Sequence, residues 1–287
     1  MTLSTEKNPF TTVIRQGESA TPSSRAAARF GVEGNAVTTG GAGALGLAVT
    51  RALLEHGAAS VTLMDFPATL ESSSEQIDKL QSSFSAQAQK IPTIPVDVTS
   101  AQMVEDTISQ AVSDVGGIDI LCCLACVLSC IASVSATQVK FQKVIDVNLT
   151  GSFHRAQTVA KHMTSQNRGG SIVFTSSISA HHTNFPQPQV AYNASKATVL
   201  HMTRNLATEW AVYGIRVNSI SPGYMNTILN AGDNLKPIRE IWAASCPMGR
   251  MRDVEEITAP FVLLNSKSGG RYITGADTVV DGGAMAL

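Results

Sequence analysis

The sequence predicts one α/β domain: a doubly wound parallel sheet with helices on both faces. From Asn35 onward, short apolar stretches alternate with longer stretches of helical periodicity, which is typical of a parallel sheet covered on both faces. No linker, internal repeat or low-complexity tract divides the 287 residues. Residues 1–29 are rich in Ser, Thr, Ala and charge and lack a sustained period. We therefore expect a flexible arm over residues 1–29 and a single domain over residues 30–287.

In the first half of the chain, the pattern predicts four strands, over residues 36–38, 61–64, 93–96 and 118–123. Helical stretches separate them, with one ending near residue 56, a polar one ending near residue 85, and one over residues 100–115. A long helix over residues 137–164 follows. The second half predicts strands over residues 172–177, 215–220 and 277–280 and helices over residues 192–213 and 253–265.

Composition excludes several classes of protein. The net charge is −1 and 15% of residues are charged, so the sequence offers no basic surface for nucleic acid. Twenty uncharged residues lie between Asp119 and Lys140, but serine, threonine and glutamine fill their second half, which favours a strand and loop over a membrane span. The N-terminus lacks the apolar core of a secretory signal. We expect a cytoplasmic protein with free thiols and no membrane association.

Tyr192 and Lys196 are the candidate catalytic pair. Their four-residue spacing puts both side chains on one face of a helix. An isolated phenol has a pKa of about 10. A neighbouring ammonium favours the phenolate, so we expect Lys196 to lower the pKa of Tyr192. Ser177, at the end of the preceding strand, can hydrogen-bond the same substrate oxygen. Such pairs also occur by chance on helices, but together the three side chains suit acid/base chemistry on a carbonyl or an alcohol.

A glycine-rich turn follows the first predicted strand and opens a helix. Its candidate cofactor residues are Gly40, Gly41, Ala44, Leu45 and Gly46. In this context glycines permit a tight turn and let a pyrophosphate approach the helix N-terminus, as in a Rossmann-type site. An ordinary strand-to-helix turn is the alternative interpretation.

Asp65 ends the second predicted strand, about twenty residues beyond the glycine turn. A carboxylate at this position of the fold accepts hydrogen bonds from the adenosine ribose and repels the 2′-phosphate of NADP. No cation stands in the turn or directly after Asp65. We therefore expect NAD, with NADP as the less favoured alternative; in the competing interpretation Asp65 only caps the next segment.

These motifs together resemble the short-chain dehydrogenase/reductase family over roughly residues 30–287. The resemblance rests on Thr39-Gly40-Gly41-Ala42-Gly43-Ala44-Leu45-Gly46, Ser177, Tyr192-x3-Lys196, Pro222-Gly223, Thr274-Gly275 and Val280-Asp281-Gly282-Gly283. Asn184-Phe185-Pro186-Gln187 and Pro222-Gly223-Tyr224 are similar to the fungal polyol and ketose subgroup, which includes mannitol, sorbose and arabinitol dehydrogenases. Reductases of secondary-metabolite ketones share these features.

The resemblance implies an oxidoreductase that transfers a hydride between a nicotinamide and a secondary alcohol or ketone. It assigns Asn148 to a proton relay with Lys196, beside the acid/base Tyr192 and Ser177. It further assigns to the cofactor site Asp97, Val98, Tyr192, Lys196, Pro222, Gly223 and Thr227. It also implies a homotetramer.

The sequence departs from the family at the end of the fourth predicted strand. Cys123-Leu124-Ala125-Cys126 stands where the family generally has Asn-Asn-Ala-Gly, and a thiol cannot replace the amide hydrogen bonds of the first asparagine. This leaves a non-redox lyase, cyclase or binding protein as the alternative function. Cys122 and Cys123 point to opposite faces of a strand, so we expect no metal site. His181 and His182 either line the substrate pocket or are exposed loop residues.

Overall fold

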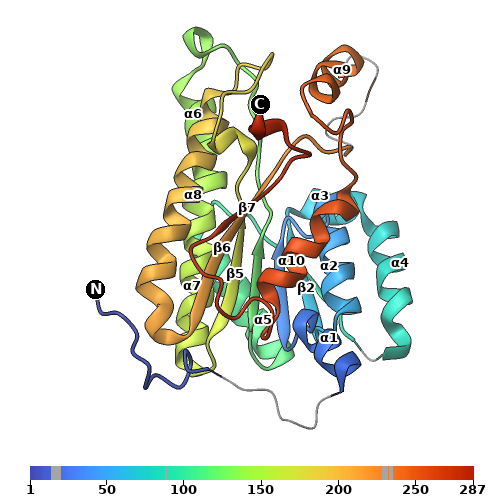
Figure 1. The fold of residues 1–287 in the computed structure, drawn as a ribbon. Helices are drawn as coiled ribbons and strands as arrows, with labels where there is room; N and C mark the ends of the chain where they lie inside the picture. The colour runs from blue at the N-terminus through green and yellow to red at the C-terminus, as the bar shows by residue number, and fades with distance from the viewer. Residues whose placement is uncertain (14–20, 88, 228–231, 233–234) are drawn as a thin grey trace.

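A seven-stranded parallel sheet forms the centre of the protein, as the computed structural model shows for residues 1–13, 21–87, 89–227, 232 and 235–287 (Figure 1). The strand order is β3-β2-β1-β4-β5-β6-β7. The strands are β1 (Asn35–Thr39), β2 (Ser60–Asp65), β3 (Thr93–Pro95), β4 (Ile120–Cys123), β5 (Gly170–Thr175), β6 (Ile215–Pro222) and β7 (Asp277–Val280). The predicted fold class is confirmed.

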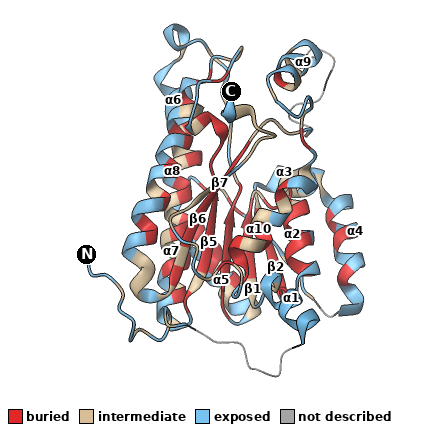
Figure 2. Ribbon diagram, viewed as in Figure 1, coloured by how far each residue is buried: buried red, intermediate tan, exposed pale blue. Residues whose placement is uncertain are grey.

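Helices cover both faces of this sheet, and buried residues concentrate on the strands and on the inward helix faces (Figure 2). One apolar cluster joins the sheet to α2 (Ala44–Glu55), α4 (Ser74–Phe84) and α10 (Thr258–Asn265). The other joins it to α5 (Ala101–Val115), α7 (Gly151–Ser165) and α8 (Val190–Trp210). Cys122 belongs to the first cluster and Cys123 to the second, so adjacent strand residues do face opposite sides.

The carboxyl ends of the parallel strands meet at one edge, and the order reverses between β1 and β4. In open α/β sheets this crevice is the usual place for ligands. The glycine turn follows β1, Ser177 follows β5, and Pro222 ends β6. The sheet thus gathers the predicted site residues at one edge.

The structure differs from the predicted elements in several places. The helix expected over residues 137–164 consists of α6 (Gln138–Ile145), a π-helical turn (Asp146–Thr150) and α7. The helix expected to end near residue 85 is two helices, α3 (Pro67–Ser72) and α4, because Ser73 leaves helical geometry between them. A further helix, α9 (Lys236–Ala244), lies where the sequence shows little periodicity.

The N-terminal segment contacts the domain at several points. It contains α1 (Pro22–Phe30), whose Thr21 cap accepts a hydrogen bond from the Ser24 N–H. The Arg29 carbonyl accepts one from Ser266 Oγ at 2.8 Å, and Asn8 Nδ2 donates to the Val212 carbonyl at 2.9 Å. The boundary at residues 29/30 stays a prediction. Within the described ranges, none of the helices combines the length and apolar character needed to cross a membrane.

Candidate active site

Three elements bring the predicted catalytic residues together. Tyr192 and Lys196 lie on α8, and Lys196 Nζ is 5.5 Å from the centre of the Tyr192 ring. Ser177 caps the short 3₁₀ turn after β5 and is hydrogen-bonded to the Tyr192 hydroxyl. Asn148 lies in the π-helical turn, and its Nδ2 donates to Ser195 Oγ, next to Lys196, at 3.1 Å. The four residues therefore share one site at the sheet edge.

Burial governs the protonation of Tyr192. Burial raises the pKa of the phenol well above its usual range, the nearby Cys126 thiol raises it further, and the Ser177 hydrogen bond opposes both. The expectation that Lys196 lowers this pKa stays a prediction. The Lys196 ammonium is directed to the Thr175 carbonyl, 2.7 Å away, instead of to the phenol oxygen.

Lys196 is itself almost fully buried, with 2% of its surface exposed. Burial lowers the pKa of its ammonium, while the Cys126 thiol opposes this effect. The main chain also holds the residue, because Ser176 Oγ donates to the Lys196 carbonyl at 3.1 Å. Both ends of Lys196 are thus fixed to the end of β5.

The Asn148 amide makes three hydrogen bonds. Its Oδ1 accepts from the Val127 N–H at 2.8 Å, and its Nδ2 donates to the Val127 carbonyl at 2.9 Å as well as to Ser195. The π-helical turn widens the helix at this point and lets the side chain reach the loop after β4. Asn148 therefore ties that loop to the start of α8.

The glycine turn packs too closely for side chains. Gly40 has a φ of +70°, and a Cβ there would lie 2.6 Å from the Ala125 nitrogen. A Cβ at Gly46 would collide with the Gly40 carbonyl, and Gly41 is similarly confined. The helix that begins at Ala44 and Leu45 has no side-chain cap at Gly43, so its first N–H groups are available to an anion. These features fit a pyrophosphate.

A second polar cluster lies beside Tyr192. The Tyr224 and Trp242 rings are stacked with their centres 4.4 Å apart. Asn184 Nδ2 donates to the Tyr224 hydroxyl at 2.8 Å, and Trp242 Nε1 donates to Gln187 Oε1 at 3.1 Å. These four residues, which we call the Tyr224 cluster, connect the loop after β5 to α9.

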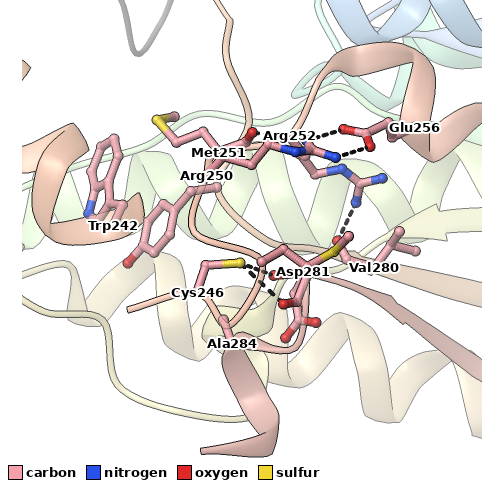
Figure 3. A pocket seen from close by; sticks show the side chains of 12 residues that line it. Trp242, Cys246, Arg250, Met251, Arg252, Glu256, Val280, Asp281 and Ala284 are labelled. Atoms are coloured by element: carbon pink, nitrogen blue, oxygen red, sulfur yellow. Dashed lines mark hydrogen bonds and ion pairs between the residues drawn. The ribbon is translucent and has the colours of Figure 1, made fainter. Parts of the chain in front are cut away.

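A cavity of about 150 Å³ adjoins the Tyr224 cluster on the side of the C-terminal segment. Figure 3 shows Trp242 at one end and Val280 at the other, with Cys246 directed at the main chain of Asp281. The Arg250–Glu256 ion pair, at 2.6 Å, closes one side. The lining includes Tyr224 but none of the four predicted catalytic residues, so this cavity borders the site without containing it.

Comparisons with known proteins agree with this geometry. The family described as "Enoyl-(Acyl carrier protein) reductase" matches residues 40–285. An "NADP-dependent mannitol dehydrogenase" of Hypocrea jecorina is 35% identical over 258 residues, which cover 88% of this chain and 93% of the relative. "Sorbose reductase sou1" of Schizosaccharomyces pombe is 35% identical and covers 85% and 93%.

The chain belongs to the short-chain dehydrogenase/reductase family. Among solved structures, an "NADPH-Dependent 3-Quinuclidinone Reductase" from Rhodotorula rubra matches with a TM-score of 0.84 and 30% identity, over 97% of this chain and 100% of that one. The protein is an NAD(P)-dependent oxidoreductase that interconverts secondary alcohols and ketones. Nothing in the comparisons supports a non-redox lyase, cyclase or binding protein.

The expectation that NAD is the cofactor was wrong, because similar proteins in the family are named NADP-dependent or NADPH-dependent. The physical reason lies at Asp65. Its Oδ2 accepts the Ala42 N–H at 3.1 Å and its Oδ1 accepts the Phe66 N–H at 2.7 Å. Burial nevertheless raises the pKa of the carboxyl. The carboxylate is thus hydrogen-bonded to the main chain of the glycine turn and of the next residue.

The other predicted cofactor residues lie along the same edge. Asp97 Oδ1 accepts from both the N–H and the hydroxyl of Thr99, which lowers the pKa of the carboxyl, while Val98 is nearly buried. Gly223 follows Pro222 and donates its N–H to the Val280 carbonyl at 2.9 Å. Thr227 lies two residues beyond Met225 and donates to its carbonyl. Contact of these residues with the cofactor remains a prediction.

The family's asparagine position holds a buried thiol beside a buried cation. Cys123 is 3% exposed and Arg155, on α7, is 1% exposed. Arg155 Nη2 donates to Ser152 Oγ at 2.9 Å, and Ser152 Oγ donates to the Asn148 carbonyl at 2.7 Å. Burial lowers the pKa of Arg155, and Cys123 opposes this. The sequence analysis did not single out Arg155. An arginine on the apolar face of a predicted helix would have indicated a buried cation here.

The two histidines after Ser177 lie in different surroundings. His181 Nε2 lies 3.0 Å from Asp277 Oδ2 and 3.2 Å from Ser221 Oγ, so it connects its loop to β6 and β7. His182 is exposed. Among the described residues, no group of three or more His, Cys, Asp or Glu side chains is arranged to hold a metal ion.

Proposed function

We propose that the protein interconverts polyols and ketoses with NADP(H), using Tyr192 as the acid/base. One observation carries this proposal: Ser177, Tyr192 and Lys196 meet beside a glycine turn that fits a pyrophosphate. The substrate class is supported by relatives named for mannitol and sorbose.

In ketone reduction, the Tyr192 O–H gives its proton to the substrate oxygen. Ser177 donates a hydrogen bond to the same oxygen and so orients it for the transfer. Because burial raises the pKa of Tyr192, the phenol carries at neutral pH the proton that the reduction requires. The bound nicotinamide supplies or accepts the hydride.

Lys196 and Asn148 act once Tyr192 has given its proton to the substrate. The Lys196 ammonium lies beside the phenol ring, where its charge favours the phenolate formed during reduction. Asn148 fixes the backbone of the loop after β4 against α8. We assign Asn148 to the relay that returns a proton to Lys196.

The glycine turn and the strand ends would hold the cofactor. Gly40, Gly41 and Gly46 permit close approach of the pyrophosphate, and the N–H groups at Ala44 and Leu45 can bind it. The adenosine would lie against Asp97 and Val98, and the nicotinamide against Pro222, Gly223 and Thr227. Names of similar proteins favour NADP(H). A homotetramer and a cytosolic location complete the proposal, and the five free thiols suit a reducing compartment.

The decisive experiment measures the rate of NADPH oxidation with a panel of ketones. The panel includes sorbose, the ketose formed by oxidation of mannitol, and 3-quinuclidinone. We expect turnover with the ketoses, more with NADPH than with NADH, and a loss on the order of 10²–10⁴-fold in Tyr192→Phe. Turnover of 3-quinuclidinone alone would replace the ketose proposal by a cyclic-ketone reductase, which the structural similarity to the Rhodotorula enzyme favours as the second candidate. Normal turnover by Tyr192→Phe would refute the mechanism.

A further inference from the structure

Tyr224 is a second phenol in the site that the chemistry described above does not use. Tyr224 comes two residues after β6 ends at Pro222, at the same edge of the sheet where Ser177 follows β5, and its charge also affects the pKa of Tyr192. It accepts a hydrogen bond from Asn184 Nδ2 at 2.8 Å. A phenol hydroxyl can accept and donate at once, and no acceptor for the Tyr224 O–H is seen among the described residues, so this O–H can donate to a ligand.

The position of Tyr224 is fixed before any ligand binds. Trp242, only 4% exposed, stacks on its ring at an interplanar angle of 6°. Trp242 is fixed in turn by the 3.1 Å hydrogen bond to Gln187. Asn184 is 6% exposed, and its Oδ1 has no hydrogen-bond partner among the described residues. Asn184 and Trp242 are buried, whereas Tyr224 and Gln187 are partly exposed. An unpaired buried amide oxygen is unfavourable, so this arrangement suits a wall that binds a polar ligand.

Burial raises the pKa of Tyr224, with Asn184 opposing this effect, so the hydroxyl keeps its proton at neutral pH. Its proton is therefore available for donation to an oxygen of a ligand. The reacting oxygen of the substrate is already bound by Ser177 and Tyr192. Tyr224 is left with a different oxygen, on a carbon near the carbonyl.

We propose that Tyr224 determines substrate specificity, by hydrogen-bonding a hydroxyl group of the substrate next to the reacting carbon. The enzyme would thus prefer α-hydroxy ketones and the corresponding vicinal diols over simple ketones. This inference rests on the proposed ketone reduction and assigns the residue that recognises the hydroxyl next to the carbonyl. A site built to pair with a substrate hydroxyl discriminates strongly against the analogue that lacks it.

The test compares Tyr224→Phe with wild type on two ketones that differ by one hydroxyl, 1-hydroxy-2-butanone and 2-butanone. We expect kcat/KM for the hydroxylated ketone to fall about 10- to 100-fold and that for 2-butanone to stay within about twofold. Tyr272→Phe is the matched control, because Tyr272 is fully exposed and the same atom is removed. Thermal unfolding and NADPH binding verify that each variant is folded.

A second variant keeps the hydroxyl but removes its support. Asn184→Leu should reduce the selectivity ratio in the same direction, by a smaller factor. An equal loss on both ketones in Tyr224→Phe, or no loss on either, would overturn the proposal. If wild type reduces both butanones but neither sorbose nor the ketose formed from mannitol, the proposed polyol function is refuted. The ratio of kcat/KM for the two butanones then still tests the role of Tyr224.

Discussion

At the scale of single residues, Tyr192 shows how burial and hydrogen bonding oppose each other on one phenol. Burial disfavours the phenolate, while Ser177 favours it, and burial dominates. Reduction consumes the protonated phenol and oxidation consumes the phenolate. The two directions must therefore depend on pH in opposite ways.

Alcohol oxidation should accelerate with pH, because the raised pKa of Tyr192 leaves little phenolate at neutral pH. We expect kcat/KM for oxidation to rise from about pH 7 to about pH 10, whereas ketone reduction stays level through neutral pH. Initial rates in both directions over this range provide the measurement. An oxidation plateau already reached near neutral pH would mean that the loaded site lowers the pKa of Tyr192 instead.

Asp65 should contribute to stability more than to cofactor choice. Asp65→Ala removes the acceptor for the Ala42 and Phe66 N–H groups and should lower the free energy of unfolding by about 2–3 kcal/mol. Asp65→Asn, which retains one acceptor oxygen, should lose less. Chemical denaturation measures both. A switch in the NADPH/NADH ratio of kcat/KM without a loss of stability would contradict this role.

Arg155 should be replaceable by an apolar residue of similar length. Its Nε and Nη1 have no hydrogen-bond partner among the described residues, and buried ions are often replaced by apolar side chains without loss. We expect Arg155→Met to leave the free energy of unfolding unchanged or to raise it by about 1–4 kcal/mol. Arg155→Ala, which leaves a cavity, is the contrasting control. A less stable Met variant would show that the guanidinium is paired.

At the scale of elements, the π-helical turn controls the loop after β4. Asn148 reaches Val127 and Ser195 only because this turn interrupts the helical ladder between α6 and α7. The sequence marked Asn148 as an unusual residue within a helix, but no local pattern distinguishes a π-helical turn from an α-helix.

Asn148→Ala should loosen the loop after β4. Loss of the three amide hydrogen bonds should reduce the free energy of unfolding by about 2–4 kcal/mol. Hydrogen exchange should accelerate at residues 124–130 before it changes in the strands. Asn205→Ala, at an exposed position of α8, provides the comparison. Unchanged exchange in this loop would contradict the role given to Asn148.

Most of the fold was predictable, because buried parallel strands read as short apolar runs and the helices between them have a clear period. The break between α3 and α4 was not, since Ser73 is an ordinary helix residue in sequence terms. Of the site, spacing and motif predicted the four candidate catalytic residues, and the structure places these residues at one edge of the sheet. The contacts of Asp65, Arg155 and Trp242 depend on tertiary neighbours, and a single sequence does not specify them.

At the scale of the whole molecule, we expect four subunits. Val139 and Phe141 of α6 are apolar and exposed, and Val279 lies on the edge strand β7. We expect partner subunits to cover these exposed apolar side chains. Light scattering should give roughly four times the 30.2 kDa of one chain. A mass of one chain at micromolar concentration would refute the assembly.

The two edges of the sheet are not equivalent. At one edge, β3 contains three residues, ends at Pro95 and follows directly after Pro92. A proline has no N–H to give to an additional strand, so β-strand addition and edge-to-edge aggregation are blocked there. The opposite edge, β7, contains no proline. If the sheet continues across a subunit boundary, it must therefore do so through β7.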